Sequence, residues 1–261
     1  MNTTPLAPSP RFYDLSLPLE ESTSEPRPLR IIYGSHEQTA AIVAGFLGAK
    51  IADLPGGFGY ASEEVSASTH TSTHVDAPWH YYPTSGGAPA RTIDQIPLDW
   101  FYGDGVVLDL RAKERGGRIT VPDLQDALEA IAYTIKPRDI VLIQTGADKL
   151  WGTPDYPLAG AGMSADAVRW LVEQGVRVMG SDAFAWDQPF YAMRQRLAQT
   201  GNPGVIFEAH RVAVDLEYCQ IDRLANLDSL PRPFGFTVIC FPIKVRAGSA
   251  GWARVVALDW T

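Results

Sequence analysis

Short apolar runs alternate with amphipathic segments through the middle of the chain. The runs at 106–110, 139–145 and 176–180 are rich in β-branched residues and bounded by turn residues, which is typical of buried strands. Between them, apolar residues recur at helical spacing after Thr120 and again after Ser164, two residue types that commonly begin helices. This alternation of strand and helix predicts a partly parallel sheet.

Further strands and helices are expected towards the two ends of the chain. Strands predominate at the two ends, which suggests that antiparallel strands join the central sheet. The expected strands are 12–17, 63–68, 236–241 and 253–258, and the expected helices are 36–47 and 188–199. We therefore predict an α/β fold with a mixed sheet and flanking helices. Because no linker or repeat divides the chain, we expect a single domain at 11–261 after a flexible arm at 1–10.

The composition limits the classes of partner. The chain has 261 residues, 46% of them apolar, and 22 basic against 30 acidic side chains give a formal charge of −8. Nucleic acids and anionic membranes attract clustered Lys and Arg, so this balance argues against both. No apolar run approaches the roughly 18 residues of a membrane span, and the first ten residues do not resemble a signal peptide. The two cysteines, Cys219 and Cys240, form no disulfide framework, so we expect a cytoplasmic protein.

Three of the five histidines lie within one segment of eleven residues. A uniform scatter would place roughly 0.2 of a histidine in such a window. The pattern is H-x3-H-x-D-x3-H, formed by His70, His74, Asp76 and His80. Imidazole nitrogens and a carboxylate oxygen are ligands for divalent metals such as Zn2+ and Mn2+. Four such groups have no packing reason to gather, so the segment predicts a metal site rather than a polar surface loop.

The spacing also restricts the backbone of this segment. At about 3.3 Å per residue, His70 and His74 would lie about 13 Å apart in an extended chain, which is too far to share one ion. Two threonines, a valine and a following proline disfavour a long helix. We therefore expect a strand that enters the segment, a turn near 71–73, and a loop that presents Asp76 and His80.

The same residues resemble the signature H-x-G-T-H-x-D-x-P-x-H of the cyclase family of metal-dependent hydrolases, which includes bacterial kynurenine formamidases and isatin hydrolases. The chain matches it except that Ser72 stands at the usual glycine, where a turn with positive φ would be strained. The resemblance extends over most of the chain through the segments 14–16, 145–152, 180–187, 208–211 and 225–227. It implies a swivelling β/β/α single domain and a homo-oligomer, either a dimer or a tetramer.

The resemblance also implies roles for individual residues. His70, His74 and Asp76 match metal ligands, and His80 matches the catalytic acid/base. His210 matches a late histidine that ligates a second zinc in formamidases and relays protons in other members. His210 is therefore either a second catalytic residue or part of a second metal site.

Two residues near position 220 bear on the number of metal ions. The formamidase pattern has a bridging Glu where this chain has Asp222. A carboxylate shortened by one methylene retreats by about 1.5 Å, well beyond the roughly 0.2 Å tolerance of a metal bond. Gln220 matches a glutamine that completes a single-metal site, usually with Mn2+, in isatin hydrolases. The alternatives are a polar strand end for Gln220 and, for Asp222, a helix cap or a salt bridge with Arg223.

These matches favour one ion per chain, Mn2+ or Zn2+. Its expected ligands are His70, His74, Asp76 and Gln220, and His210 and Asp222 are left as the candidates for a second metal.

Such a site supports hydrolysis without a covalent nucleophile. A divalent ion lowers the pKa of bound water and polarises a carbonyl, and His80 can take the proton and return it to a leaving nitrogen. We expect hydrolysis of a C–N bond other than a peptide bond, with an isatin-like lactam as the substrate class. The alternatives are an N-formylkynurenine hydrolase with two zinc ions, a lyase or cyclase, and a non-catalytic metal-binding protein of the same fold.

The expected substrate is a small aromatic amide or lactam. Aromatic residues that could line its pocket are Trp79, Phe58, Trp186 and Trp252, with core packing as the alternative for each of them.

Overall fold

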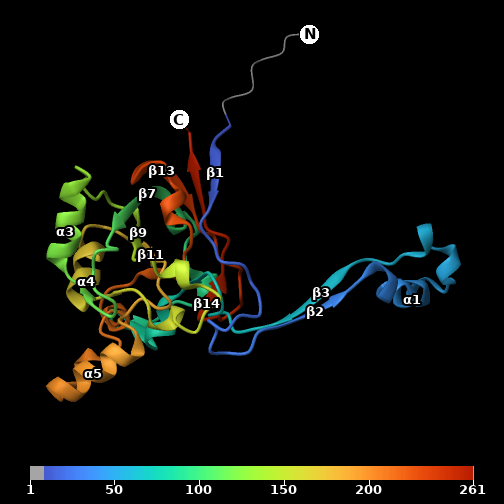
Figure 1. Ribbon diagram of the computed structural model, residues 1–261, viewed down its shortest axis with the longest axis horizontal. Helices are drawn as coiled ribbons and strands as arrows, with labels where there is room; N and C mark the ends of the chain where they lie inside the picture. Colours follow the sequence, from blue (N-terminus) through green and yellow to red (C-terminus); the bar gives the residue numbers. More distant parts are fainter. Residues whose placement is uncertain (1–8, 261) are drawn as a thin grey trace, which may run out of the picture.

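The computed structural model describes residues 9–260 and is built on one nine-stranded sheet (Figure 1). Its strands, from one edge to the other, are β1 (Arg11–Asp14), β15 (Val256–Asp259), β13 (Phe234–Ile239), β7 (Tyr102–Asp109), β9 (Ile140–Gln144), β11 (Val178–Ser181), β12 (Cys219–Asp222), β4 (His74–Asp76) and β14 (Ala250–Trp252). The four strands from β7 to β12 are mutually parallel, and the remaining pairs are antiparallel. The mixed sheet predicted from the sequence is confirmed.

Three two-stranded sheets lie outside the main sheet. They are β2 (Arg30–Gly34) with β3 (Ser62–Ser66), β5 (Thr84–Ser85) with β6 (Ala88–Pro89), and β8 (Arg118–Ile119) with β10 (Gly162–Met163). The α-helices of the described residues are α1 (His36–Leu47), α2 (Pro78–Tyr81), α3 (Val121–Ala130), α4 (Ala165–Glu173) and α5 (Phe190–Thr200). None of these helices is long and apolar enough to cross a membrane.

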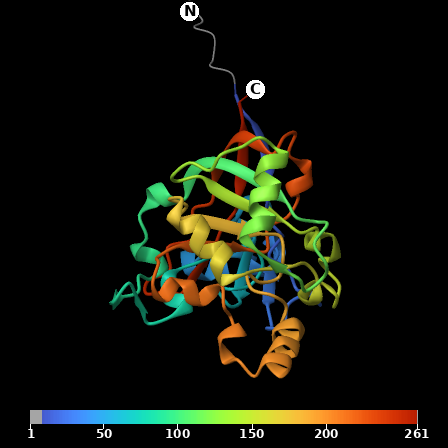
Figure 2. The same ribbon diagram turned by 90° about the vertical axis from the view of Figure 1, so that its left-hand side faces the viewer.

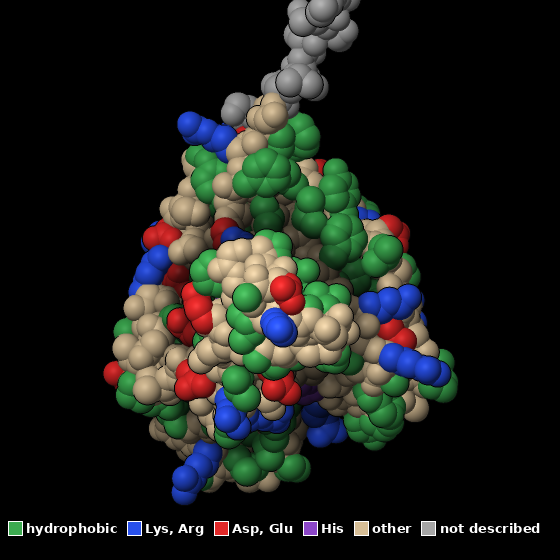
Figure 3. All heavy atoms as spheres, turned by 90° about the vertical axis from the view of Figure 1, so that its right-hand side faces the viewer, with side chains coloured by type: hydrophobic (Ala, Val, Ile, Leu, Met, Phe, Trp, Pro, Cys, Tyr) green, Lys and Arg blue, Asp and Glu red, His purple; other side chains and the backbone are tan. Residues whose placement is uncertain are grey.

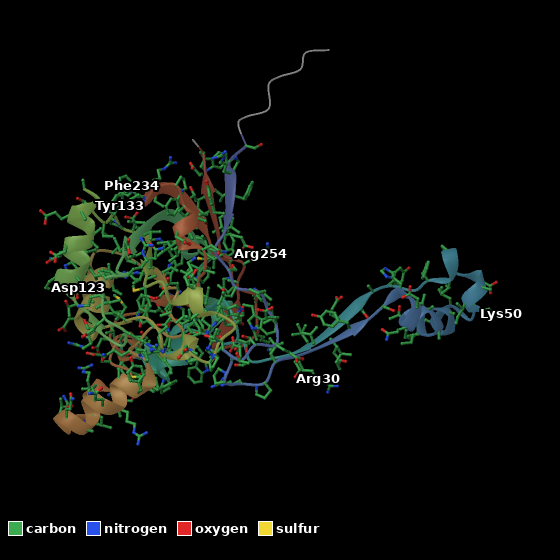
Figure 4. The ribbon with its side chains drawn as sticks, viewed as in Figure 1. Arg30, Lys50, Asp123, Tyr133, Phe234 and Arg254 are labelled. Carbon is green, nitrogen blue, oxygen red and sulfur yellow. The ribbon has the colours of Figure 1, made fainter. Side chains whose placement is uncertain are left out.

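The helices α3 and α4 pack together over one face of the sheet (Figure 2). The capping residues predicted from the sequence begin both helices. Ser164 Oγ accepts a hydrogen bond from the N–H of Ala167, and the Asp123 carboxylate accepts one from the N–H of Thr120. These bonds satisfy backbone groups that a helix end leaves without partners. Further along, Tyr133 packs against Phe234 with ring centroids 4.8 Å apart (Figure 4).

Side chains of the central strands alternate between two apolar layers. In β9, Val141 and Ile143 face the helices, whereas Ile140 and Leu142 face a second core enclosed by the antiparallel strands. All four side chains are buried. A strand that is buried on both faces has a continuous run of apolar residues, and this run allowed β9 to be predicted from the sequence.

A long hairpin, here called the hairpin extension (residues 30–66), projects from the body of the molecule (Figure 1). It consists of β2, α1, two 3-10 turns and β3, and Arg30 and Lys50 mark its near and far parts (Figure 4). Its own core is small and comprises Ala40, Ala44 and Leu54. The strand predicted at 63–68 therefore exists as β3, but it pairs only with β2 and not with the main sheet.

The sequence pattern did not predict the three strands at one edge of the sheet. β4, β12 and β14 contain three or four residues each, and two of them carry alternating polar side chains that resemble a loop. Of the arm expected at 1–10, residues 1–8 lie outside the described residues. The division into an arm and a single domain stays a prediction.

A substitution at Gly162 can test how closely β10 packs against the segment that follows β11. A Cβ added there would lie 2.0 Å from the backbone nitrogen of Gln188 and 2.1 Å from the carbonyl carbon of Asp187, and neither backbone atom can move alone. We expect Gly162→Ala to lower the free energy of unfolding by at least about 2 kcal/mol in urea denaturation. In the control Gly45→Ala, the added Cβ would meet no atom within 4 Å and sits in a helix, so stability should not fall. Equal stability of the two variants would contradict this packing.

Candidate metal centre

Two neighbouring strands carry the polar centre of the site. The register of β4 and β12 pairs Asp76 with Gln220 and His74 with Asp222. Because alternate residues of a strand point to the same face, these four side chains share one side of the sheet. Val75, between the two β4 residues, points the other way into the apolar core.

A turn before β4 brings His70 back towards this face. The ring centroids of His70 and His74 are 5.2 Å apart, far less than the separation in an extended chain. The turn expected near 71–73 is therefore confirmed. His70, His74 and Asp76 each offer a ligand atom, and these atoms lie within 4.8 Å of one another.

Ser72 occupies the tightest point of this turn. Its φ of 54° lies in the left-handed region, which costs a residue with a Cβ roughly 1–2 kcal/mol. Its hydroxyl lies 3.0 and 2.9 Å from the carbonyl oxygens of Leu17 and Pro18, and its N–H donates to the Glu25 carboxylate over 2.7 Å. These bonds offset the strain, so serine is compatible with a position that is usually glycine.

The Asp76 carboxylate is the point where the site nitrogens converge. Its Oδ1 lies 2.8 Å from His70 Nδ1 and 3.3 Å from His74 Nε2, yet this buried oxygen accepts no hydrogen bond. At metal bond lengths of about 2.1 Å, two ligands of one ion lie about 3.0–3.4 Å apart. Both imidazole nitrogens therefore lie about as far from Asp76 Oδ1 as two ligands of one cation lie from each other.

Each of these two imidazoles is held through its other nitrogen. His74 Nδ1 lies 2.7 Å from the carbonyl oxygen of Ser72, and since a carbonyl only accepts, Nδ1 carries a hydrogen, so that in the neutral imidazole the lone pair lies on Nε2. His70 Nε2 lies 2.9 Å from Ser249 Oγ, which leaves Nδ1 directed at Asp76. Bonds of this kind fix the tautomer and orientation of histidines that bind metals.

The site places two carboxylates in a buried position. Burial alone would raise the pKa of Asp76, but the neighbouring histidines, above all His80 and His74, hold that pKa well below its usual range. Burial, together with the charge of Asp76, raises the pKa of Asp222 to about 6. Two carboxylates in one buried site repel each other, and a cation between them would relieve that repulsion.

His80 approaches from the short helix α2, and Asp76 ends strand β4. The expectation of a loop for these two residues is therefore wrong: pairing of β4 with a strand on each side keeps it extended, and the proline after Ala77 starts a helical turn. His80 Nε2 lies 3.6 Å from Asp76 Oδ2. Burial lowers the pKa of His80 to about 4, so its imidazole is neutral at pH 7.

Gln220 faces Asp76 from the neighbouring strand. Its Nε2 lies 3.2 Å from Asp76 Oδ2 and 3.0 Å from His210 Nε2. Its Oε1 is buried and accepts no hydrogen bond. Because buried polar atoms are normally paired, this oxygen is able to take a further partner.

His210 begins a 3-10 helix, η8 (His210–Val214), and Asp187 orients it. Its Nδ1 forms a short hydrogen bond with Asp187 Oδ2, and the backbone N–H groups of Ala209 and His210 donate to the same carboxylate. Asp76, His80 and His210 form a second group whose ligand atoms lie within 4.8 Å of one another. Asp222 does not belong to that group.

A cavity of about 410 Å³ lies over these residues. Besides the polar side chains already described, Phe184, Phe190 and Phe207 line it. The ring centroid of Phe207 lies 5.8 Å from that of His210. The cavity therefore combines polar lining residues with these three phenylalanines, here called the aromatic wall.

The four aromatic residues expected in the pocket do not line this cavity. Trp186 is buried in the core beneath the helices, and Phe58 lies in the hairpin extension beside His36. Trp252 lies in β14, where its Nε1 donates to the carbonyl of Ser68, and Trp79 is 44% exposed on α2. In place of them, the phenylalanines of two later segments supply the aromatic wall.

Three residues that support the site were not identified from the sequence: Asp187, Ser249 and Tyr81. The Tyr81 hydroxyl accepts the N–H of Gln220 over 3.1 Å and lies 3.3 Å from the carbonyl oxygen of Asp76, so it bridges the two strands. Asp187 ends a segment that resembles the family, but nothing in its spacing pairs it with a histidine 23 residues later.

Comparison with known proteins agrees with this geometry. The model of the Cyclase family, described as "Putative cyclase", matches residues 13–188. A kynurenine formamidase of Salinibacter ruber is 29% identical over 198 residues, which cover 74% of this chain and 77% of that protein. A kynurenine formamidase of Erythrobacter litoralis is 27% identical over 192 residues, which cover 74% of each chain.

Solved structures share the fold. An isatin hydrolase bound to the product analogue thioisatinate has a TM-score of 0.76 at 21% identity, with 97% of this chain and 94% of that chain covered. Isatin hydrolase A from Ralstonia solanacearum has a TM-score of 0.73 at 24% identity, with 96% and 92% covered. The family match spans most of the described fold and includes the segment that carries the histidines. The chain belongs to the Cyclase family of metal-dependent hydrolases.

Proposed function

We propose that this protein opens an isatin-like lactam by hydrolysis at a single divalent ion. The observation that carries the proposal is the convergence of His70 Nδ1, His74 Nε2 and the unpaired Asp76 Oδ1 next to a neutral His80. The outer nitrogens of both imidazoles are already hydrogen-bonded. The two imidazoles and the carboxylate are therefore oriented as ligands before an ion binds.

The fourth proposed ligand is Gln220, through its buried and unpaired Oε1. Imidazole nitrogen suits Zn2+ and Mn2+ alike, whereas carboxylate and amide oxygens suit the harder Mn2+. A set of two nitrogens and two oxygens therefore fits Mn2+ or Zn2+, with one ion per chain.

When bound, such an ion lowers the pKa of a coordinated water and polarises the substrate carbonyl. His80 is neutral, so it accepts the proton that the attacking water gives up. The oxygen of that water forms a bond to the carbonyl carbon, and the C–N bond of the ring then breaks. His80 returns the proton to the leaving nitrogen, which gives an amine and a carboxylic acid, and the acid loses its proton to solvent to become the ring-opened carboxylate.

The aromatic wall supports a flat bicyclic substrate. Phe184, Phe190 and Phe207 line the same cavity as Asp76 and His80, so an aromatic ring that packs against them would lie close to these two polar side chains. Solved structures of isatin hydrolases with the same fold are consistent with this substrate class.

Hydrolysis of N-formylkynurenine at two zinc ions is the second candidate. The grouping of Asp76, His80 and His210 favours it, because these residues offer a second set of ligand atoms within 4.8 Å. The names of the curated relatives support it as well. Against it, Gln220 already donates to the His210 nitrogen that a second ion would need.

We also propose that two copies of the chain associate through the hairpin extension (Figure 3). Large apolar side chains exposed on it are Ile32, Tyr33, Ile42, Phe46, Leu47, Ile51, Phe58, Tyr60 and Val65. If about half of the surface of each of these nine side chains were covered, each copy would bury an area on the order of 800 Å². That is what one partner contributes to a standard interface. A two-stranded hairpin is marginally stable alone, so contact with a second copy would also hold the extension in place.

A cytoplasmic location fits the state of the cysteines. Cys219 and Cys240 are both free and buried, as expected in a reducing compartment. The proposed partner of the active site is a small aromatic molecule, and the net charge of −8 gives no support for nucleic acid or membrane binding.

The first prediction concerns the ion. Protein purified without chelator should contain one Mn2+ or Zn2+ per chain by elemental analysis, and Asp76→Asn should contain less than about a tenth of that amount, because the oxygen on which both imidazoles converge loses its charge. Two ions per chain would favour the formamidase candidate. A metal-free protein that cannot be loaded by added Mn2+ or Zn2+ would contradict both.

The second prediction concerns His80. We expect His80→Ala to lower kcat for isatin opening by a factor of roughly 10²–10⁴ while the metal content stays unchanged, because this side chain moves the proton and is not a proposed ligand. His36→Ala, a histidine in the hairpin extension, is the matched control and should leave kcat unaltered. Assays with isatin and N-formylkynurenine in parallel decide between the substrate classes, and no turnover of aromatic amides by the metal-loaded enzyme would support the non-catalytic alternative.

The third prediction concerns assembly. Phe46 is 86% exposed on α1, and Phe46→Glu places a charge in the proposed contact. We expect the wild-type protein to sediment as a dimer or tetramer, and the variant to weaken its self-association at least tenfold. Gln195→Glu on the exposed side of α5 adds the same charge elsewhere and should leave association unchanged. A monomeric wild-type protein would rule out the proposal.

A further inference from the structure

A second cavity, here called the side pocket, adjoins the cavity over the metal centre. Its volume is about 390 Å³, and three residues line both cavities: His80, Phe207 and His210. The other residues that line the side pocket are Tyr81, Tyr82, Ile206 and Arg211. A substrate that binds beside His80 can therefore extend into the side pocket.

The side pocket combines apolar surface with one positive charge. Tyr82, Ile206 and Phe207 are between 36% and 45% exposed, so they offer contact area to an apolar part of a ligand. Arg211 supplies a guanidinium group, and none of the seven described residues that line the pocket is acidic. This lining suits a ligand with an apolar body and an anionic end.

The guanidinium group of Arg211 is free for such a ligand. Within residues 9–260, its side chain is exposed and forms no hydrogen bond or ion pair. The acidic residues nearest to it in sequence are Glu208 and Asp215, and both are paired with other arginines. The pocket therefore holds a positive charge that its own neighbours do not neutralise.

Two other arginines line the cavity over the metal centre, and both make hydrogen bonds. Arg223 donates to both carboxylate oxygens of Glu25, which neutralises its charge. Arg27 donates to the hydroxyl of Ser68 over 3.0 Å, and it has no carboxylate partner among the described residues. Arg27 is therefore the alternative to Arg211 that an experiment has to separate.

We propose that Arg211 is a specificity-determining residue that binds a carboxylate of the substrate in the side pocket. The inference rests on the proposed function and narrows its substrate class to aromatic amides or lactams with a carboxylate away from the scissile C–N bond. A guanidinium binds a carboxylate through two parallel N–H···O bonds, which fixes both the position and the orientation of the ligand. The anionic end would be held in the side pocket while the amide lies in the cavity over the metal centre.

The first experiment measures binding without turnover. Indole is bicyclic like isatin but has no amide to hydrolyse, so the probes are indole-5-carboxylate and indole-6-carboxylate, with their methyl esters as neutral references. By isothermal titration calorimetry, we expect the purified protein to bind at least one carboxylate at least about tenfold more tightly than its ester. Arg211→Gln should reduce this preference to less than about threefold, and Arg211→Lys should retain part of it.

Two further variants locate the anion. Arg27→Gln removes the alternative guanidinium, and Arg11→Gln removes an exposed arginine on β1, outside both cavities. Both variants should keep the full preference for the carboxylate. Because the Arg211 side chain has no partner among the described residues, Arg211→Gln should unfold at the same temperature as the wild-type protein.

The second experiment separates the substrate from the product as the source of the carboxylate. It compares isatin with the isatin carboxylate that corresponds to the tighter indole probe. We expect Arg211→Gln to lower the ratio of kcat/KM for the anionic lactam to kcat/KM for isatin at least about tenfold, through KM and not through kcat. Weaker inhibition by the product isatinate, with that ratio unchanged, would assign the pocket to the product and overturn the inference.

The remaining outcomes are distinct. A preference that persists in Arg211→Gln would place the carboxylate on the proposed ion or on Arg27, and equal binding of acid and ester by the wild-type protein would leave the pocket without an anion site. Each of these results overturns the inference and leaves the proposed function intact. Binding of the indole carboxylates through Arg211 by a protein that hydrolyses no aromatic amide or lactam would overturn the proposed function and leave the anion site in place.

Discussion

The antiparallel register of β4 against β12 is the constraint on which the site depends. It sets Asp76 opposite Gln220 and His74 opposite Asp222, so four polar side chains meet on one face of the sheet. On the opposite face, Val75 and Ile221 are fully buried in the second apolar core. A shift by one residue would exchange these faces, burying charge in that core and exposing aliphatic side chains to the cavity. The packing of the core therefore holds the chemistry in place.

The remaining groups of the site are attached to this pair of strands by polar bonds. Ser249 and Ser72 hold the outer nitrogens of two imidazoles, Tyr81 bridges the strands, and Asp187 holds His210. Each of these contacts restrains a side chain that already faces Asp76. These bonds restrain the side chains independently of an ion, which lowers the ordering cost of binding.

The sequence predicted those parts of the protein whose pattern is local. β9 is a run of apolar residues, and Ser164 caps a helix with clear periodicity, so both were found. The turn near 71–73 followed from the reach of the chain between two histidines. The segment 63–68 was found as a strand, but its pairing in the hairpin extension depends on residues 28 to 36 positions away, where β2 carries no strong pattern of its own.

The supporting residues could not be predicted, because their partners are distant in the sequence. His70 and Ser249 are separated by 179 positions, and Gln220 and Asp76 by 144. Only the sheet topology brings them together. The choice among aromatic residues was open for the same reason: core packing was the alternative for each candidate, and Trp186 lies in the core, whereas Phe207 lines the cavity.

Ser72 has a consequence for how this sequence can change over time. Its hydroxyl ties the turn to Leu17 and Pro18, and its N–H ties it to Glu25, which also pairs with Arg223. A glycine at position 72 would free the backbone but lose the hydroxyl contacts, whereas loss of the Glu25 carboxylate would remove the partner of the Ser72 N–H and leave the strained turn with less compensation. We therefore expect position 72 and the 17–25 segment to co-vary in evolution. Replacement of only one of the two by the segment of a related sequence would be disfavoured by selection.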